Sequence, residues 1–317
     1  MFRLVKYFIK YTLISFYKEK NTFFVQKRII KRNIIILNEE FKFNEKDFIS
    51  FIKNCFMENT QTYISTIIDT FNQGIVNSCS HSKYKELKIN IENIKILCLK
   101  NYSIFIGLYE LNTFIKEMEP YKIDFIFSPY LLIDTNIKKL NNRLYILITD
   151  TFANLIIYNN NQFQYSNILR FQDNEELEDN LIEDKNNEDF NELDEMDELV
   201  DDIDDLENLD DIDDLENLDD INDLDNDNDY DYDNNISTQL ENTKNELSLI
   251  EFIKNSINDY YNNYDADFLE QIEILYSNEL SKTLIKNIQD ETLLEVNLKQ
   301  INILSTINEF ALKEINV

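Results

Sequence analysis

The sequence predicts an α/β fold, because segments with the two-residue period of strands alternate with segments that have the longer period of helices. Three antiparallel strands are expected within residues 144–169, and helix and strand alternate again in the last quarter of the chain. The length of 317 residues corresponds to about two domains. The apolar residues outside one acidic segment suffice for one large core or two.

The first 43 residues are rich in strand-forming residues. Met1–Tyr17 is apolar but carries basic residues. Its 17 residues are too few and too charged to span a membrane. Its apolar residues recur at helical spacing. This fits either a basic amphipathic helix on an anionic membrane surface or a first strand or helix packed on the core, and we favour the packed element. Residues 22–43 predict two strands with a break at the charged Lys27–Arg32.

Capping residues mark two helix starts. Asn44 is expected to cap a helix that ends near Met57, because its side chain can accept a hydrogen bond from the first turn. Ser128 and Pro129 begin a second helix that ends near Leu140, since Ser is a favoured cap and Pro a favoured first helical residue. The elements expected between them are β-rich runs at Tyr63–Phe71 and Leu87–Leu99, a helix at Tyr109–Met118 that ends before Pro120, and a strand at Ile123–Phe127.

The clearest pattern is a meander of three antiparallel strands at Leu144–Thr149, Asn154–Tyr158 and Phe163–Leu169. Asp150 opens its first turn, and three consecutive Asn residues form the second. Beyond the acidic segment, Ile236–Tyr264 has the apolar stripe of one long amphipathic helix. The elements expected after it are a strand at Gln271–Tyr276, a helix at Glu279–Ile288, a strand at Leu293–Val296 and a helix at about Leu304–Ile315.

An acidic segment separates the meander from the long helix. Residues 173–233 hold 32 of the 61 acidic residues and one of the 30 basic ones, so the rest of the chain is neutral although the whole carries a formal charge of −31. The sequence DDIDDLENL occurs at 201–209 and again at 210–218, and this period gives no continuous apolar stripe on a helix. We expect residues 173–235 to be a disordered insertion that serves either as a docking segment for a basic partner or as a solvated linker.

The composition excludes several functions. A chain this acidic repels a phosphate backbone, so no nucleic-acid partner is expected. Two Gly residues are too few for the Gly-rich phosphate loops. Cys55, Cys79 and Cys98 have no CxxC spacing and predict reduced, buried thiols. The lone His81 is interpreted as a loop or surface residue, and it leaves too few ligands for a metal site and no catalytic triad.

The order of elements resembles the actin-like (RNase H-like) fold of the PilM family of pilus assembly proteins and of the cytoplasmic domain of the type II secretion L component. The resemblance covers Leu87–Leu169 and Ser237–Val317, and it rests on element order and hydrophobic pattern. It implies a first domain at residues 1–139, to which the helix at 303–317 returns. The second domain would consist of residues 140–172 and 236–302.

The nucleotide motifs of that family are degenerate here. The phosphate motif of the family has the form Asp-Ile-Gly-x-Ser/Thr, and the corresponding turn of this chain holds Asp150, Thr151, Phe152 and Asn154. The adenosine turn, three Gly residues in the family, is Tyr276, Ser277 and Asn278, and the first phosphate loop lacks both its Gly and a suitable Asp. Side chains at these points, including the Phe152 ring, are expected to clash with a nucleotide, because Gly allows the close approach of the backbone. Asp150 is expected to be a turn residue rather than a magnesium ligand.

The resemblance implies a non-catalytic scaffold without a cofactor, in a type IV pilus, type II secretion or DNA-uptake assembly. The partners it implies are the cytoplasmic tail of a PilN-like single-pass membrane protein, bound in a groove of the first domain, and the motor ATPase of the assembly. The expected location is cytoplasmic and peripheral to the inner membrane. The alternatives are a divergent actin-like ATPase with weak nucleotide binding around Asp150, and an acidic interaction protein whose active part is the segment 173–235.

Overall fold

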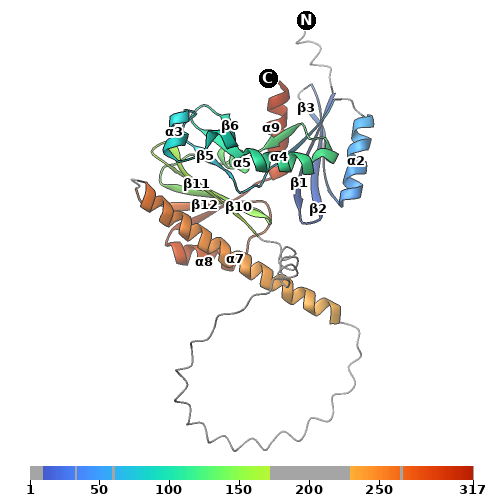
Figure 1. The fold of residues 1–317 in the computed structure, drawn as a ribbon. Helices are drawn as coiled ribbons and strands as arrows, with labels where there is room; N and C mark the ends of the chain where they lie inside the picture. Colours follow the sequence, from blue (N-terminus) through green and yellow to red (C-terminus); the bar gives the residue numbers. More distant parts are fainter. Residues whose placement is uncertain (1–9, 33, 59–60, 172–228, 265–266, 317) are drawn as a thin grey trace, which may run out of the picture. The chain divides into compact units, whose positions relative to one another are not determined.

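The computed structural model describes residues 10–32, 34–58, 61–171, 229–264 and 267–316 (Figure 1). Within these ranges the strands form two five-stranded sheets and one three-stranded sheet. The sheets and their helices, up to Phe171 and from Lys244 onward, make one compact unit.

The first sheet begins with a meander of three antiparallel strands, β1 (Lys10–Glu19), β2 (Thr22–Lys31) and β3 (Ile34–Phe43). From Lys10 onward, the N-terminal segment is therefore a packed strand. The alternative prediction, an amphipathic helix within Met1–Tyr17, also includes the residues before Lys10. Those residues lie outside the described part of the chain.

Helix α2 (Glu45–Glu58) crosses from the meander to the rest of the first sheet. Its predicted cap is confirmed, because the side chain of Asn44 accepts a hydrogen bond from the backbone N–H of Asp47 at 3.0 Å. Strands β4 (Thr62–Ile67) and β8 (Phe125–Phe127) complete the sheet in the order β3-β2-β1-β4-β8, with β4 parallel to β1 and β8 parallel to β4.

The residues between β4 and β8 form a smaller unit that the sequence predicts only in part. Its sheet has the order β5-β7-β6, with β5 at Gln73–Val76, β6 at Ile94–Cys98 and β7 at Ser103–Gly107. Its helices are α3 (His81–Glu86) and α4 (Leu108–Glu117), with short 3-10 turns at Ile91–Asn93 and Glu119–Tyr121. The helix before Pro120 is confirmed. Elements β5, β7 and α3 are missed, because such short elements carry little periodicity.

Helix α5 (Pro129–Asn136) leads to the second sheet, and Ser128 caps it as expected. The predicted meander is confirmed as β9 (Arg143–Ile148), β10 (Phe152–Asn159) and β11 (Gln162–Arg170). The elements after the acidic segment are α7 (Asp229–Asn263), β12 (Gln271–Tyr276), α8 (Lys282–Thr292), β13 (Glu295–Gln300) and α9 (Ile303–Asn316). The sheet order is β11-β10-β9-β12-β13, with β12 parallel to β9 and to β13.

The two five-stranded sheets share one topology. Each begins with three antiparallel strands and then adds two strands, parallel to the first strand, on its other side. A duplicated sheet of this kind is the actin-like (RNase H-like) architecture, so the fold class expected from the sequence is confirmed. The residue bounds of the two domains stay a prediction.

One apolar core joins the two sheets. It includes Ile67 of the first sheet, Leu147 of the second and Ile307 of α9, all largely excluded from solvent. Helix α9 also packs on β1 and β4, and Ser15 Oγ donates a hydrogen bond to the backbone carbonyl of Leu304 at 2.8 Å. The last helix is therefore held against the first strand of the chain.

Two charged residues lie inside β2 where the sequence predicts a break. Strand β2 instead continues without a break to Lys31, and Arg32 follows as a turn residue. Lys27 is tolerated because its buried stem carries the ammonium group to Glu58 Oε2 at 2.8 Å. Arg28 donates to Ser305 Oγ of α9 at 2.7 Å, so its charge is satisfied across the sheet.

Two helix boundaries also differ from the expectation. Helix α5 ends at Asn136 rather than near Leu140. Helix α7 begins at Asp229, so the last residues of the segment expected to be disordered are helical. The rest of that expected insertion lies outside the described residues.

Candidate functional site

The two degenerate turns lie side by side at one end of the second sheet. Asp150 follows β9 and Asn278 follows β12, and these strands are parallel neighbours. Asn278 Nδ2 donates a hydrogen bond to Asp150 Oδ2 at 2.7 Å. The turn at Asp150 is thus bonded directly to the turn at Asn278, although the two motifs are far apart in the sequence.

The phosphate turn is closed by a side chain of its own. Thr149 Oγ1 accepts hydrogen bonds from the backbone N–H groups of Thr151 at 3.4 Å and Phe152 at 3.1 Å. Backbone N–H groups of such a turn are the donors that a bound phosphate would use. Thr149 is not among the residues predicted from the sequence. The signal that could have identified it is a hydroxyl residue at a strand end directly before an Asp.

The ring of Phe152 is buried in the core and does not lie beside the turn. This corrects the expected clash of this ring with a nucleotide. Phe152 is 2% exposed and belongs to the core that joins the two sheets. The reason is that β10 begins at Phe152, and strand alternation turns Phe152, Asn154 and Ile156 to the same buried face. Asn154 is fully buried, and neither polar atom of its side chain has a partner among the described residues.

Glu19 faces Asp150 from the first sheet. It ends β1, next to the β1–β2 turn, and it is 7% exposed. Burial, the charge of Asp150 and a hydrogen bond to Asp150 raise the pKa of Glu19 to about 8. The Glu19 carboxyl group therefore keeps its proton at neutral pH. Glu19 is not among the residues predicted from the sequence, because no sequence pattern pairs these distant segments.

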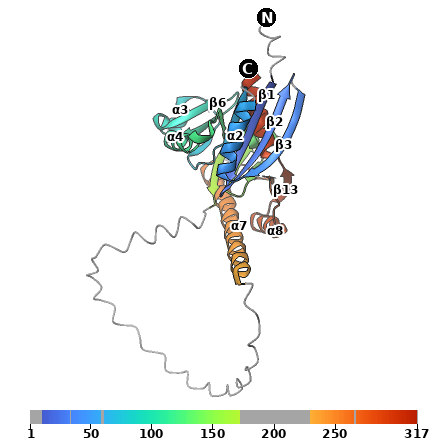
Figure 2. The ribbon, with the colours of Figure 1, turned by 90° about the vertical axis from the view of Figure 1, so that its right-hand side faces the viewer.

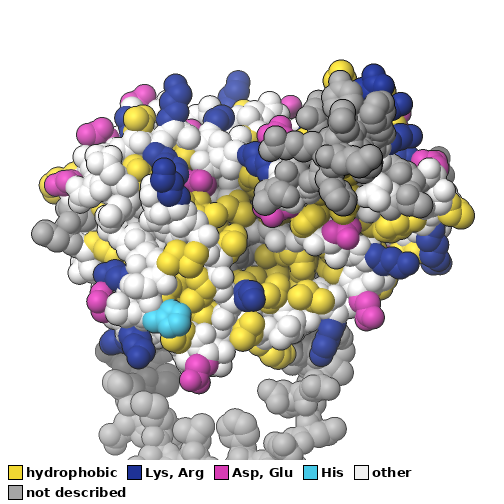
Figure 3. Space-filling view, turned by 90° about the horizontal axis from the view of Figure 1, so that it is seen from above, with side chains coloured by type: hydrophobic (Ala, Val, Ile, Leu, Met, Phe, Trp, Pro, Cys, Tyr) yellow, Lys and Arg dark blue, Asp and Glu magenta, His cyan; other side chains and the backbone are white. Residues whose placement is uncertain are grey.

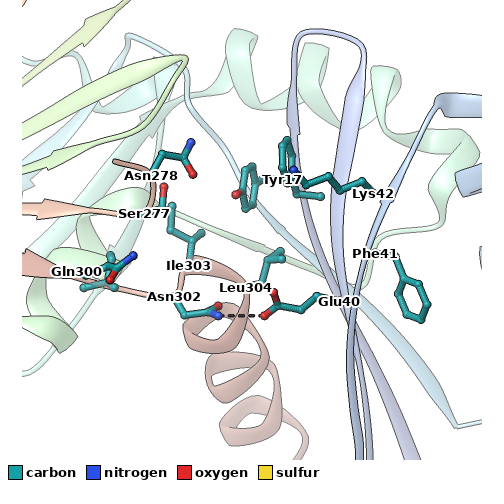
Figure 4. A pocket seen from close by; sticks show the side chains of 12 residues that line it. Tyr17, Glu40, Phe41, Lys42, Ser277, Asn278, Gln300, Asn302, Ile303 and Leu304 are labelled. Carbon is teal, nitrogen blue, oxygen red and sulfur yellow. Dashed lines mark hydrogen bonds between the residues drawn. The ribbon is translucent and has the colours of Figure 1, made fainter. Parts of the chain in front are cut away.

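A cavity of about 630 Å³ opens beside these turns (Figure 4). It is lined by Tyr17, Phe24, Glu40, Phe41 and Lys42 of the first sheet and by Ser277, Asn278, Gln300, Ile301, Asn302, Ile303 and Leu304. The rings of Tyr17 and Phe24 stack with centroids 5.2 Å apart, and Lys42 Nζ lies 4.8 Å from the Phe24 centroid. Asn302 Nδ2 donates to Glu40 Oε1 at 3.0 Å, so the start of α9 is bonded to β3.

Acidic groups surround the Tyr17 hydroxyl at this cavity. Burial and the carboxylates of Glu19, Asp150 and Glu40 raise the pKa of the Tyr17 hydroxyl far above its usual value. Phosphate groups are bound by backbone N–H groups and cations, whereas the turns here present carboxyl groups and amides already in use. Among the described residues, no three His, Cys, Asp or Glu side chains are arranged to hold a metal ion.

The remaining residues singled out in the sequence lie away from this cavity. Cys55 is buried, but Cys79 and Cys98 are exposed, which corrects the expectation of buried thiols. Cys79 and Cys98 belong to the smaller unit between β4 and β8, whose short elements offer few buried positions. All three thiols are free. His81 is exposed as expected, although it begins helix α3 rather than lying in a loop.

Comparison with known families places the chain. The family model described as a domain of unknown function, DUF8341, matches residues 144–316, more than half of the sequence. The chain belongs to the DUF8341 family. A second domain of unknown function, DUF8569, matches residues 8–134 of this DUF8341 protein. No curated protein sequence matches it significantly.

Several solved structures are similar to the DUF8341 chain. One is a Bacteroides thetaiotaomicron protein with an actin-like ATPase fold and unknown function, at 13% identity, coverage of 99% of this chain and 97% of that one, and a TM-score of 0.40. The PilM-PilN type IV pilus biogenesis complex is 8% identical, with coverage of 94% of this chain and 90% of that one and a TM-score of 0.48. Ethanolamine utilization protein EutJ from Carboxydothermus hydrogenoformans is 6% identical, with coverage of 95% of this chain and 88% of that one and a TM-score of 0.38. The fold assignment rests on the sheet topology rather than on these overlays.

Proposed function

We propose that this protein is a non-catalytic actin-like scaffold at the cytoplasmic face of the inner membrane, in a type IV pilus, type II secretion or DNA-uptake assembly. The observation that supports it is that the nucleotide turns are bonded to one another. Asn278 is bonded to Asp150, protonated Glu19 lies beside Asp150, and Thr149 accepts hydrogen bonds from the backbone N–H groups of this turn. An actin-like body with these turns closed is suited to bind proteins rather than ATP. The choice of assembly rests on the resemblance in element order.

The proposed partner is the cytoplasmic tail of a PilN-like membrane protein, with the motor ATPase of the assembly as a second partner. The smaller unit of the first half supports a peptide site. Leu97 on the edge strand β6 is 50% exposed, and Tyr109 and Ile115 on α4 are 79% and 47% exposed. Hydrophobic side chains gather near the centre of the face seen in Figure 3. An edge strand can pair with an extended peptide, and exposed apolar side chains of the same unit can contact its side chains.

ATP is expected to give no thermal stabilisation. A ligand at 100 times its Kd adds about 2.7 kcal/mol to the free energy of unfolding, so a nucleotide that binds with a Kd of about 50 μM would be obvious at about 5 mM. The measurement is a thermal melt with and without ATP and Mg²⁺, with an active actin-like ATPase as the positive control. A shift in the wild type that Asp150→Ala abolishes would instead show nucleotide binding around Asp150 and would favour the divergent ATPase.

Binding of the tail is expected to survive loss of the acidic segment. We would replace residues 173–228 by a short Gly-Ser linker, which leaves helix α7 intact, and measure binding of the labelled tail of a PilN-like protein from the same genome. The linker variant should bind like the wild type. Replacement of Leu97, Tyr109 and Ile115 by Ser should weaken binding at least about tenfold. Loss of binding in the linker variant alone would show that the acidic segment is the active part.

A further inference from the structure

The end of the β2–β3 hairpin carries three consecutive exposed isoleucines. Ile34, Ile35 and Ile36 are 67%, 51% and 57% exposed, whereas Ile30, which pairs with Ile35 on β2, is buried. Strand β3 is an edge strand of the first sheet. Ile is among the residue types most often buried. A run of exposed Ile on an edge strand therefore indicates a surface that another body covers.

The geometry of this run disfavours an added β-strand as that body. Consecutive strand residues point to opposite faces, so the three isoleucines present apolar surface on both faces of the sheet. Ile36 is also a bulged residue, because Ile29 pairs with Leu37 and Ile30 pairs with Ile35. A bulge bends an edge strand away from regular pairing. An environment that surrounds the hairpin end fits both observations better than a strand at its edge.

Basic residues accompany the isoleucines. Lys31 and Arg32 lie at the turn of the hairpin, and Lys10 pairs with Lys31 in the β1–β2 register; all three are exposed. Figure 2 shows that the chain enters β1 at the same end of the sheet. This composition complements a surface that is negative outside and apolar beneath.

We propose that the hairpin end, defined as Lys31, Arg32 and Ile34–Ile36, docks on an anionic lipid bilayer. The isoleucines enter the boundary between headgroups and acyl chains, and the basic side chains contact anionic headgroups. Each Lys or Arg near such a surface raises the affinity of a protein for the membrane about fivefold. No helix within the described ranges is long and apolar enough to cross a membrane, so this contact lies at the surface. It needs no protein partner, and it stands or falls independently of the function proposed above.

Vesicle flotation of the full chain tests the proposal. The wild type should float with phosphatidylcholine vesicles that contain about 30 mol% phosphatidylglycerol, and the bound fraction should fall severalfold with neutral vesicles or at high salt. The triple variant Ile34→Ser, Ile35→Ser, Ile36→Ser should lose roughly tenfold in affinity. The matched control replaces three other exposed apolar residues, Leu247, Phe268 and Leu293, by Ser and should bind normally. Thermal melts of both variants would show that the fold is kept.

A fluorescence measurement provides a second readout. The chain contains no Trp, so Ile35→Trp introduces a single reporter at the hairpin end. Its emission should shift to shorter wavelength when anionic vesicles are added, and emission from Phe268→Trp should not change.

Three results would overturn the proposal. They are equal binding to neutral vesicles, no effect of the triple variant, and no binding to any vesicle. If the wild type instead forms a concentration-dependent dimer that the triple variant abolishes, the isoleucines serve strand pairing between copies.

Discussion

Replacing Phe152 by Ala is expected to lower the free energy of unfolding by about 4 kcal/mol. The ring is 2% exposed and packs with Leu147 and Ile307 in the core that joins the two sheets, so truncation leaves a cavity there. The substitution also decides where the ring lies. A ring in the cleft could be removed at little cost and would leave room for a nucleotide. Urea unfolding of the variant, followed by a melt with ATP, measures both effects.

The matched control for Phe152 is Phe268→Ala. Phe268 is 84% exposed and meets Tyr261 edge-on, with 5.8 Å between the ring centroids. Its loss should lower the free energy of unfolding by less than about 1 kcal/mol. Similar losses for the two variants would contradict the position of Phe152 in the core.

Glu19→Gln is expected to stabilise the protein relative to the wild type by about 2 kcal/mol more at pH 8.5 than at pH 5. Folded Glu19 keeps its proton up to about pH 8, while the unfolded chain loses it near the ordinary value of 4.5. The folded state thus binds the proton more tightly. Its stabilising contribution is complete below the unfolded pKa and is lost as the pH rises through the folded pKa. Gln stays neutral and does not titrate.

Urea unfolding at the two pH values measures this effect, with Glu58→Gln as the control. The bond to Lys27 and the charge of Lys27 lower the pKa of Glu58, so its contribution is lost only in acid. Glu58→Gln should therefore differ from the wild type by the same amount at both pH values. A Glu19→Gln variant that behaves in the same way would show that Glu19 is ionised at neutral pH in the folded protein.

The elements that the sequence predicts correctly are those whose signals are local. The Asn44 cap and the meander from Leu144 onward depend on neighbouring residues. Lys27 and Arg28 give a misleading local signal, because their charges are satisfied by Glu58 and Ser305, which are distant in the sequence. Strands as short as β5 and β7 are specified by their pairing within the smaller sheet rather than by their own pattern.

The candidate site follows the same division. The departure from the PilM-type motifs at Asp150 and Asn278 is a prediction that the sequence alone supplies. Their mutual hydrogen bond, the approach of Glu19 and the inward turn of Phe152 depend on the pairing of β9 with β12 and on the contact between the two sheets. No periodicity within one segment specifies these relations.

The attachment of α9 to β1 has a consequence for synthesis of the chain. The bond between Ser15 and Leu304 spans 289 positions, so the first strand must wait for the last helix before its face is covered. At about 5 to 20 residues per second, ribosomes need roughly 15 to 60 s to make that stretch. The five strands of the first sheet are all made before the second sheet. The face of β1 that α9 covers stays exposed until the end of translation, and chaperones can bind it during this interval.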